Sequence, residues 1–118
     1  MIFLQKGDVV LARFPFSDLL QTKLRPAIVL CLSIVNQEVT ICFITSKNVN
    51  TLSTDEFLIQ PSDHNFLKTG LKEVSKVRVT KIVTVERKLI TRKLGNLDKG
   101  YRSTLNTIII QAFQLTES

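Results

Sequence analysis

Short segments rich in β-branched and aromatic residues, separated by polar loops, dominate the pattern of this chain. Segments of this kind predict β-strands. The expected strands cover residues 8–14, 27–34, 39–45, 56–60, 75–79 and 82–85, with a further short strand at 89–90. Because the run 27–34 is almost continuously apolar, we expect it to be a central strand covered on both faces. It would pair with 39–45 across a turn at Asn36-Gln37.

The pattern changes after Asp98. Apolar residues from Tyr101 to Phe113 recur at the spacing of one helix face, and Asp98 is placed to cap that helix. The β-branched run 107–110 lowers helix propensity, so a strand remains an alternative there. Several short strands followed by one helix predict a mainly β (α+β) fold, a small antiparallel β-barrel closed by a C-terminal α-helix. The 118 residues fit a single domain, 1–118.

Composition limits the protein class. Hydrophobic residues make up 44% and charged residues 22%, which is typical of a globular protein, and no apolar run approaches the roughly 20 residues that cross a bilayer. The N-terminus does not resemble a secretory signal, so we expect a cytoplasmic protein with no membrane partner. Cys31 and Cys42 lack metal-site spacing and are expected to be buried free thiols. We expect no metal and no cofactor.

The charge balance favours a polyanionic partner. Sixteen Lys and Arg oppose ten Asp and Glu, for a net charge of +6. Many of the basic residues lie close together in the sequence, which predicts a local basic surface. These residues are Lys76, Arg78, Lys81, Arg87, Lys88, Arg92 and Lys93.

The stretch 7–30 carries the strongest functional pattern. Two apolar runs flank the polar loop 16–24, and Arg25-Pro26 follows this loop directly. Proline disfavours helix at the preceding residue, so a guanidinium is delivered where the loop re-enters the sheet. The alternative is an ordinary solvated arginine. His64, in a polar loop, is interpreted as a solvated residue rather than a base.

Taken in order, several short motifs resemble the PemK/MazF family, the toxins of bacterial type II toxin-antitoxin pairs. The motifs are Gly7-Asp8-Val9-Val10, Phe14-Pro15-Phe16-Ser17-Asp18, Leu24-Arg25-Pro26-Ala27-Ile28-Val29-Leu30, Ile44-Thr45-Ser46, Ser75-Lys76-Val77-Arg78, Thr84-Val85-Glu86 and Arg92-Lys93-Leu94-Gly95-Asn96-Leu97. The resemblance implies an SH3-like barrel, a homodimer, and a metal-independent endoribonuclease that cuts single-stranded RNA (mRNA), often at a short preferred sequence.

Such an enzyme uses the RNA 2′-hydroxyl as nucleophile and leaves 2′,3′-cyclic phosphate and 5′-hydroxyl ends. By resemblance, Arg25 stabilises charge on the scissile phosphate and Thr45 donates a hydroxyl to it. Arg78 matches a second arginine that some members use near the cleaved bond, and the alternative is that it binds flanking phosphates. The resemblance also suggests RNA-binding residues around them. These are Asp18, Gln21, Thr22, Lys23, Ser46, Lys47, Lys76, Thr80 and Lys81.

Two departures leave the general base unassigned. Some members carry an Asp two residues after the second arginine, where this chain has Thr80. Some carry His, Glu or Gln in the loop before the first arginine, where this chain offers Asp18, Gln21 and Thr22. Three aromatic residues are candidates for stacking on bases, although at least two are expected in the core. They are Phe14, Phe16 and Phe43.

The resemblance further implies an acidic antitoxin with a flexible tail as partner, with DNA binding only through the antitoxin complex. Two other functions remain open. One is a non-catalytic basic SH3-like module that binds RNA or protein. The other is a toxin of related fold that binds DNA gyrase, for which Arg25 would be dispensable.

Overall fold

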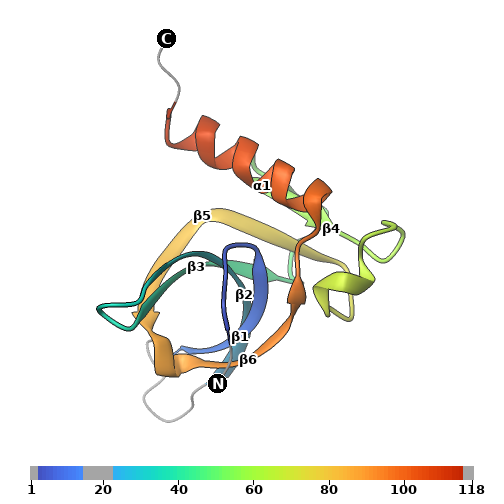
Figure 1. Ribbon diagram of the computed structural model, residues 1–118. Coiled ribbons are helices and arrows are strands. Elements are labelled where there is room, and N and C mark those ends of the chain that lie inside the picture. The colour runs from blue at the N-terminus through green and yellow to red at the C-terminus, as the bar shows by residue number, and fades with distance from the viewer. Residues whose placement is uncertain (1–2, 15–22, 116–118) are drawn as a thin grey trace.

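The computed structural model describes residues 3–14 and 23–115, and its strands form one antiparallel sheet (Figure 1). The strands are β1 (Asp8–Phe14), β2 (Lys23–Ser33), β3 (Glu38–Thr45), β4 (Glu56–Ile59), β5 (Ser75–Glu86) and β6 (Ile90–Asn96). Two 3₁₀ turns, η1 (Leu67–Thr69) and η2 (Arg87–Leu89), and one α-helix, α1 (Lys99–Ala112), complete the described elements. The strand order is β4-β5-β3-β2-β1-β6.

The sheet curls into an open barrel (Figure 1). Its strongest bend is in β5, where Cys42 of β3 lies opposite Ile82 but the next residue, Phe43, lies opposite Arg78. Residues 79–81 therefore form a bulge, and bulges bend a strand and increase its twist. Within the described residues, β4 and β6 are the two edge strands, and each pairs with another strand on one side only. The predicted mainly β fold with a C-terminal helix is confirmed, although strand pairing does not close the barrel.

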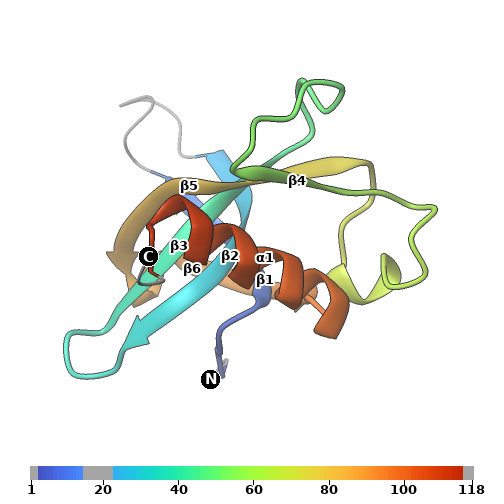
Figure 2. The same cartoon turned by 90° about the horizontal axis from the view of Figure 1, so that it is seen from above.

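Each face of the curled sheet has its own core, because side chains alternate along a strand. The outer-face core includes α1 residues, among them Leu105 and Ile108, packed on Val9, Ile28 and Val77. The inner core consists of residues such as Val10, Ala12, Ala27, Val29, Val39 and Ile41. Figure 2 shows α1 lying across the outside of the sheet. The helix thus covers one face and leaves the inner face available for a site.

The N-terminus of α1 is capped as the sequence predicts. Asp98 has extended backbone, and its Oδ1 accepts hydrogen bonds from the Tyr101 amide at 3.3 Å and from Asn65 Nδ2 at 2.7 Å. Although desolvation opposes it, these hydrogen bonds and one from the Gly100 amide lower the pKa of Asp98. Residues 107–110 are helical, so the strand alternative is wrong there. The apolar contacts of Leu105 and Ile108 compensate for the low helix propensity of this run.

The predicted strands are found, with several changed bounds. The segment 8–14 is a strand as predicted, but 75–79 and 82–85 are one continuous bent strand. The segment 89–90 is the start of the longer strand β6. Strand β2 begins at Lys23, inside the predicted loop, and only Ala27, Ile28 and Val29 of it are fully buried. The strand predicted over 27–34 is therefore covered on both faces only in the middle of β2.

The two cysteines differ in exposure. Cys42 is buried, as predicted, and burial raises the pKa of its thiol to about 12. Cys31 is exposed, so its predicted burial is wrong. It lies beyond the buried middle of β2, where the strand extends past the core. Among the described residues, no helix combines the length and apolar character needed to span a membrane.

Candidate nucleic-acid interface

The inner face of the sheet becomes polar toward the start of β2 and the end of β3. Ala27 lies opposite Phe43, and Phe43 lies opposite Arg78. Arg78 in turn lies opposite Glu56 of β4. Directly opposed residues of antiparallel strands place their side chains on the same face. This row therefore crosses four strands, from the inner core to a cation and a carboxylate.

Pro26 ends the ladder between β2 and β3. Its register partner in β1 is Leu11, whereas the pairing of β2 with β3 begins one residue later, at Ala27. Proline has no amide N–H to donate, so the ladder cannot continue through its nitrogen. Arg25, the preceding residue, lies exposed at the point where this pairing has stopped.

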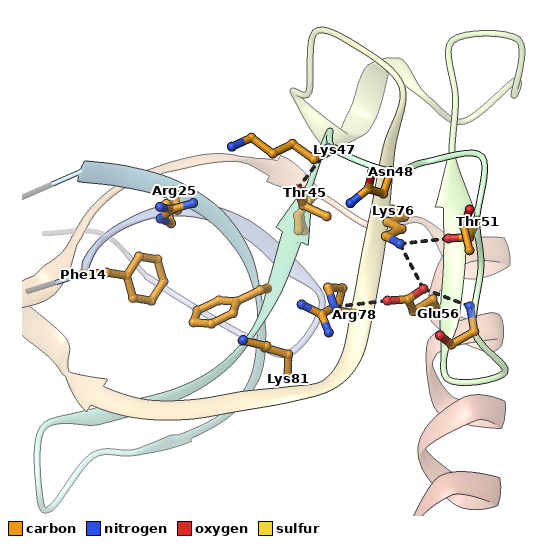
Figure 3. A pocket seen from close by; sticks show the side chains of 13 residues that line it. Phe14, Arg25, Thr45, Lys47, Asn48, Thr51, Glu56, Lys76, Arg78 and Lys81 are labelled. Carbon is orange, nitrogen blue, oxygen red and sulfur yellow. Dashed lines mark hydrogen bonds and ion pairs between the residues drawn. The ribbon is translucent and has the colours of Figure 1, made fainter. Parts of the chain in front are cut away.

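A pocket of about 630 Å³ opens on this face (Figure 3). Figure 3 shows Arg25 on one side of the pocket, and Thr45 and Arg78 on the other. A second pocket, of about 570 Å³, shares Arg25, Thr45 and Lys47 with the first. The arginine and the threonine predicted to act on one phosphate therefore line the same two pockets.

Both pockets are strongly basic. Their Lys and Arg side chains are Lys23, Arg25, Lys47, Lys72, Lys76, Arg78, Lys81 and Arg92. The acidic ones are Glu56 and Glu73. The predicted basic surface is divided, however, because Arg87, Lys88 and Lys93 line neither pocket. Lys88 pairs with exposed Glu86, and Lys93 pairs with buried Asp8 at 3.2 Å.

Arg25 and Thr45 are available to a ligand. In the described part of the chain, no carboxylate or hydrogen-bond acceptor engages the Arg25 guanidinium. Thr45 Oγ1 accepts a hydrogen bond from the Lys47 amide at 3.1 Å. Because that bond uses the oxygen as acceptor, the hydroxyl proton of Thr45 remains available for donation.

Arg78 is held by a carboxylate. Its Nε donates to Glu56 Oε2 at 3.1 Å, and Lys76 Nζ lies 3.2 Å from Glu56 Oε1. The Ser53 amide donates to the same Oε1 at 2.9 Å. The Ser53 hydrogen bond, followed by interactions with Lys76 and Arg78, lowers the pKa of Glu56 against an opposing effect of desolvation. Glu56 is therefore ionised at neutral pH.

Two aromatic rings form the inner end of the pocket. Phe14 is buried and meets Phe43 edge to face, with ring centroids 4.7 Å apart. Lys81 Nζ lies 5.9 Å from the Phe43 ring centroid, within cation–π range. Phe14 belongs to the core, while half-buried Phe43 remains a stacking candidate. Phe16 lies outside the described residues.

The predicted RNA-binding residues are found in different places. Lys23, Ser46, Lys47, Lys76 and Lys81 line one or both pockets. Asp18, Gln21 and Thr22 lie outside the described residues.

Thr80 is exposed and lines neither pocket. Its hydroxyl donates to a carboxylate oxygen of Asp55. Some family members carry an Asp at the position of Thr80. Here the carboxylate near this position belongs to Asp55, the residue just before β4, rather than to a residue of β5.

Several pocket residues were not predicted from the sequence. Glu56 and the loop residues Asn48, Thr51 and Ser53 all line the first pocket. The loop reads as an ordinary polar connection, and Glu56 reads as the first residue of a short strand. Only the pairing of β4 with β5 brings Glu56 to Arg78.

A family model described as PemK-like, MazF-like toxin of type II toxin-antitoxin system matches residues 5–113. The chain belongs to this family. The match covers every described strand and the whole of α1. In sequence, no curated protein matches this chain.

Solved structures of similar fold agree with membership of the PemK/MazF-like family. The Mycobacterium tuberculosis toxin MazF-mt6 superposes with a TM-score of 0.71 at 21% identity, covering 93% of this chain and 99% of its own. A mycobacterial endoribonuclease in complex with its cognate antitoxin gives 0.72 at 16% identity, covering 98% and 100%. A Deinococcus radiodurans MazE–MazF structure gives 0.72 at 16% identity, with the same coverage. At such low identity these likenesses show the PemK/MazF-like fold.

Proposed function

We propose that this protein is the toxin of a type II toxin-antitoxin pair and an endoribonuclease that cuts single-stranded RNA without a metal ion. The observation that carries the proposal is the position of Arg25 and Thr45 at the junction of two basic pockets. Membership of the PemK/MazF-like family supports it, and similar structures carry the name endoribonuclease. Cleavage of mRNA would inhibit translation and growth.

The chemistry follows from what the side chains offer. The RNA 2′-hydroxyl attacks the adjacent phosphorus and the bond to the 5′ oxygen breaks, which leaves a 2′,3′-cyclic phosphate and a 5′-hydroxyl. Negative charge grows on the non-bridging oxygens during the attack. The Arg25 guanidinium can donate two charge-assisted hydrogen bonds to these oxygens, and the Thr45 hydroxyl can donate a third. Arg78, across the pocket, is the second cation for the reacting phosphate.

The two pockets provide for RNA on either side of the cleaved bond. Lys23 and Lys47 are exposed cations suited to flanking phosphates. Phe43, next to Lys81, suits stacking with an unpaired base. The proposed RNA-binding set also includes Ser46, Lys76, Thr80 and the loop residues Asp18, Gln21 and Thr22. The proton acceptor for the 2′-hydroxyl stays unassigned.

We extend the proposal to the partners. A cytoplasmic antitoxin with an acidic tail would neutralise the toxin by occupying the basic pockets, and DNA would be bound only by that complex. We also propose a homodimer. Large apolar side chains exposed at the turn after β2 support it, with Ile34 83% and Val35 93% exposed. Light scattering of the purified protein measures the mass in solution and contradicts the dimer if it reports a monomer at all concentrations.

One experiment separates this function from the alternatives. Purified protein is incubated with a mixed-sequence single-stranded RNA in excess chelator, and the fragment ends are identified by enzymatic labelling. We expect 5′-hydroxyl and 2′,3′-cyclic phosphate ends. Bound but intact RNA would indicate a non-catalytic module. Intact RNA together with inhibition of DNA gyrase would indicate the gyrase-binding class.

A further inference from the structure

Glu56 is a buried carboxylate in the wall of a basic pocket. Its side chain is only 6% exposed, and it interacts with two cations, Lys76 and Arg78. A buried charge is costly unless it is paired and hydrogen-bonded. Here both oxygens are used, Oε1 by the Ser53 amide and Lys76, and Oε2 by Arg78. Removal of this carboxylate would leave Lys76 buried without its charged partner.

Glu56 binds the Nε of Arg78 and leaves the terminal nitrogens of the guanidinium for a ligand. Glu56 accepts from Nε, at 3.1 Å, and no described residue accepts from the terminal nitrogens. A guanidinium has five N–H donors, so four remain for a ligand. The Arg78 side chain is 45% exposed, and Figure 3 shows its guanidinium between Glu56 and the interior of the pocket. The Nε bond therefore restricts the rotamer of Arg78 while its fork stays available to phosphate.

The same carboxylate fixes the loop that forms the pocket wall. Ser53 donates its amide to Oε1 at 2.9 Å, and Lys76, paired with that oxygen, donates to the Thr51 carbonyl at 2.8 Å. Thr51 and Ser53 both line the pocket. The loop and the arginine are thus tied to one charged group, which comes from the first residue of β4.

We propose that Glu56 is a positioning residue that acts through Arg78 and the loop around Thr51 and Ser53, without touching the RNA itself. It holds the Arg78 guanidinium toward the scissile phosphate and keeps the pocket wall closed around the bound strand. This inference rests on the proposed RNA cleavage. It assigns the acidic residue of the pocket a role in geometry rather than in proton transfer.

The first test is a double-mutant cycle in the RNA-cleavage assay. We expect Glu56→Gln to lower kcat about 10- to 100-fold with little change in KM, because it misplaces a group that acts in the transition state. In an Arg78→Ala background the same change should lower kcat clearly less, because only its effect through the loop around Thr51 and Ser53 remains. Equal losses in both backgrounds would show that Glu56 acts independently of Arg78 and would overturn the proposal.

Two variants serve as controls. Glu56→Asp keeps the negative charge but is too short to reach both Arg78 and the Ser53 amide, so we expect it to lose kcat as well. Full activity of Glu56→Asp would show that charge alone matters, which contradicts positioning. Glu86→Gln removes an equal charge from an exposed pair with Lys88 and should cut RNA like the original protein. Thermal unfolding of each variant confirms that it is folded before kinetics are compared.

The second test does not depend on cleavage. The Nε–H signal of Arg78 in a ¹H–¹⁵N NMR spectrum, assigned by comparison with Arg78→Ala, should exchange slowly with water because Nε donates to a buried carboxylate. In Glu56→Gln the signal should shift and exchange faster. An unchanged signal would contradict the proposed contact. If the original protein leaves RNA intact while this signal behaves as expected, the proposed function fails but the contact stands.

Discussion

Arg25 and Thr45 both line two adjoining pockets, although they belong to different strands. Both line these pockets at the point where the pairing of β2 with β3 stops, at Ala27, one residue after Pro26. Beyond that point β2 and β3 no longer pair with each other, although β2 still pairs with β1 and β3 with β5. Where the proline ends the ladder, the Arg25 and Thr45 side chains thus line the same two pockets, and the predictions for the site follow from this arrangement.

Arg25→Ala should lower kcat for RNA cleavage by roughly 10²- to 10³-fold, the usual effect of removing one donor to a developing oxyanion. Arg25→Lys should recover only part of the loss, because an ammonium lacks the bidentate fork. Arg102→Ala, which removes an exposed arginine from α1, is the matched control and should cut normally. Single-turnover cleavage of a labelled RNA measures all three. Normal cutting by Arg25→Ala would remove this residue from the site.

Thr45→Val should reduce kcat about 10- to 100-fold, since it deletes a hydroxyl donor to a charged phosphate while keeping the shape of the side chain. Thr45→Ser keeps the hydroxyl and should retain most of the activity. The same single-turnover assay measures both variants. Equal losses for valine and serine would indicate that the methyl group, and hence packing, is what matters at this position.

Lys47→Ala should weaken RNA binding and make it less dependent on salt. Loss of one phosphate contact lowers the slope of log K against log salt by about 0.7 for single-stranded nucleic acid. Fluorescence anisotropy with a 2′-deoxy oligonucleotide, which cannot be cut, gives this slope at several salt concentrations. Lys88 lines neither pocket, so Lys88→Ala should leave the slope unchanged.

Ile28→Ala should destabilise the fold by about 2 to 5 kcal/mol, because it opens a cavity in the core beneath α1. Ile34→Ala makes the same chemical change at a side chain that is 83% exposed and should alter monomer stability by less than about 0.5 kcal/mol. Urea unfolding followed by circular dichroism compares the two. Similar effects would contradict the assignment of Ile28 to the core.

Cys31 should react with a thiol reagent at pH 8, whereas Cys42 should react only after unfolding. Burial raises the pKa of Cys42 from 9.0 to about 12. Between these values the folded state keeps a proton that the unfolded state has lost, so Cys42 lowers stability as pH rises through this range. Mass spectrometry after labelling identifies the modified cysteine. Labelling of Cys42 in the folded protein would show that it is accessible.

Much of the fold follows from the sequence alone. The period of two along residues 8–14 predicts the strand found there, and the helical spacing after Asp98 predicts α1 with its cap. These features depend on residues close together in the chain, whose side chains and backbone interact locally. The ordered motifs around Arg25, Thr45 and Arg78 likewise indicate the family without reference to any tertiary contact.

Only the tertiary structure decided how the site is assembled. Glu56 and Arg78 are separated by 22 residues and by a loop without periodicity, and they meet because β4 pairs with β5. The bulge at 79–81, the exposure of Cys31 and the binding of Thr80 to Asp55 are also set by neighbours distant in sequence. Strand register and burial depend on which strands become neighbours in the sheet. The local pattern predicted the individual strands, but the packing of the sheet determined which charges they bring together.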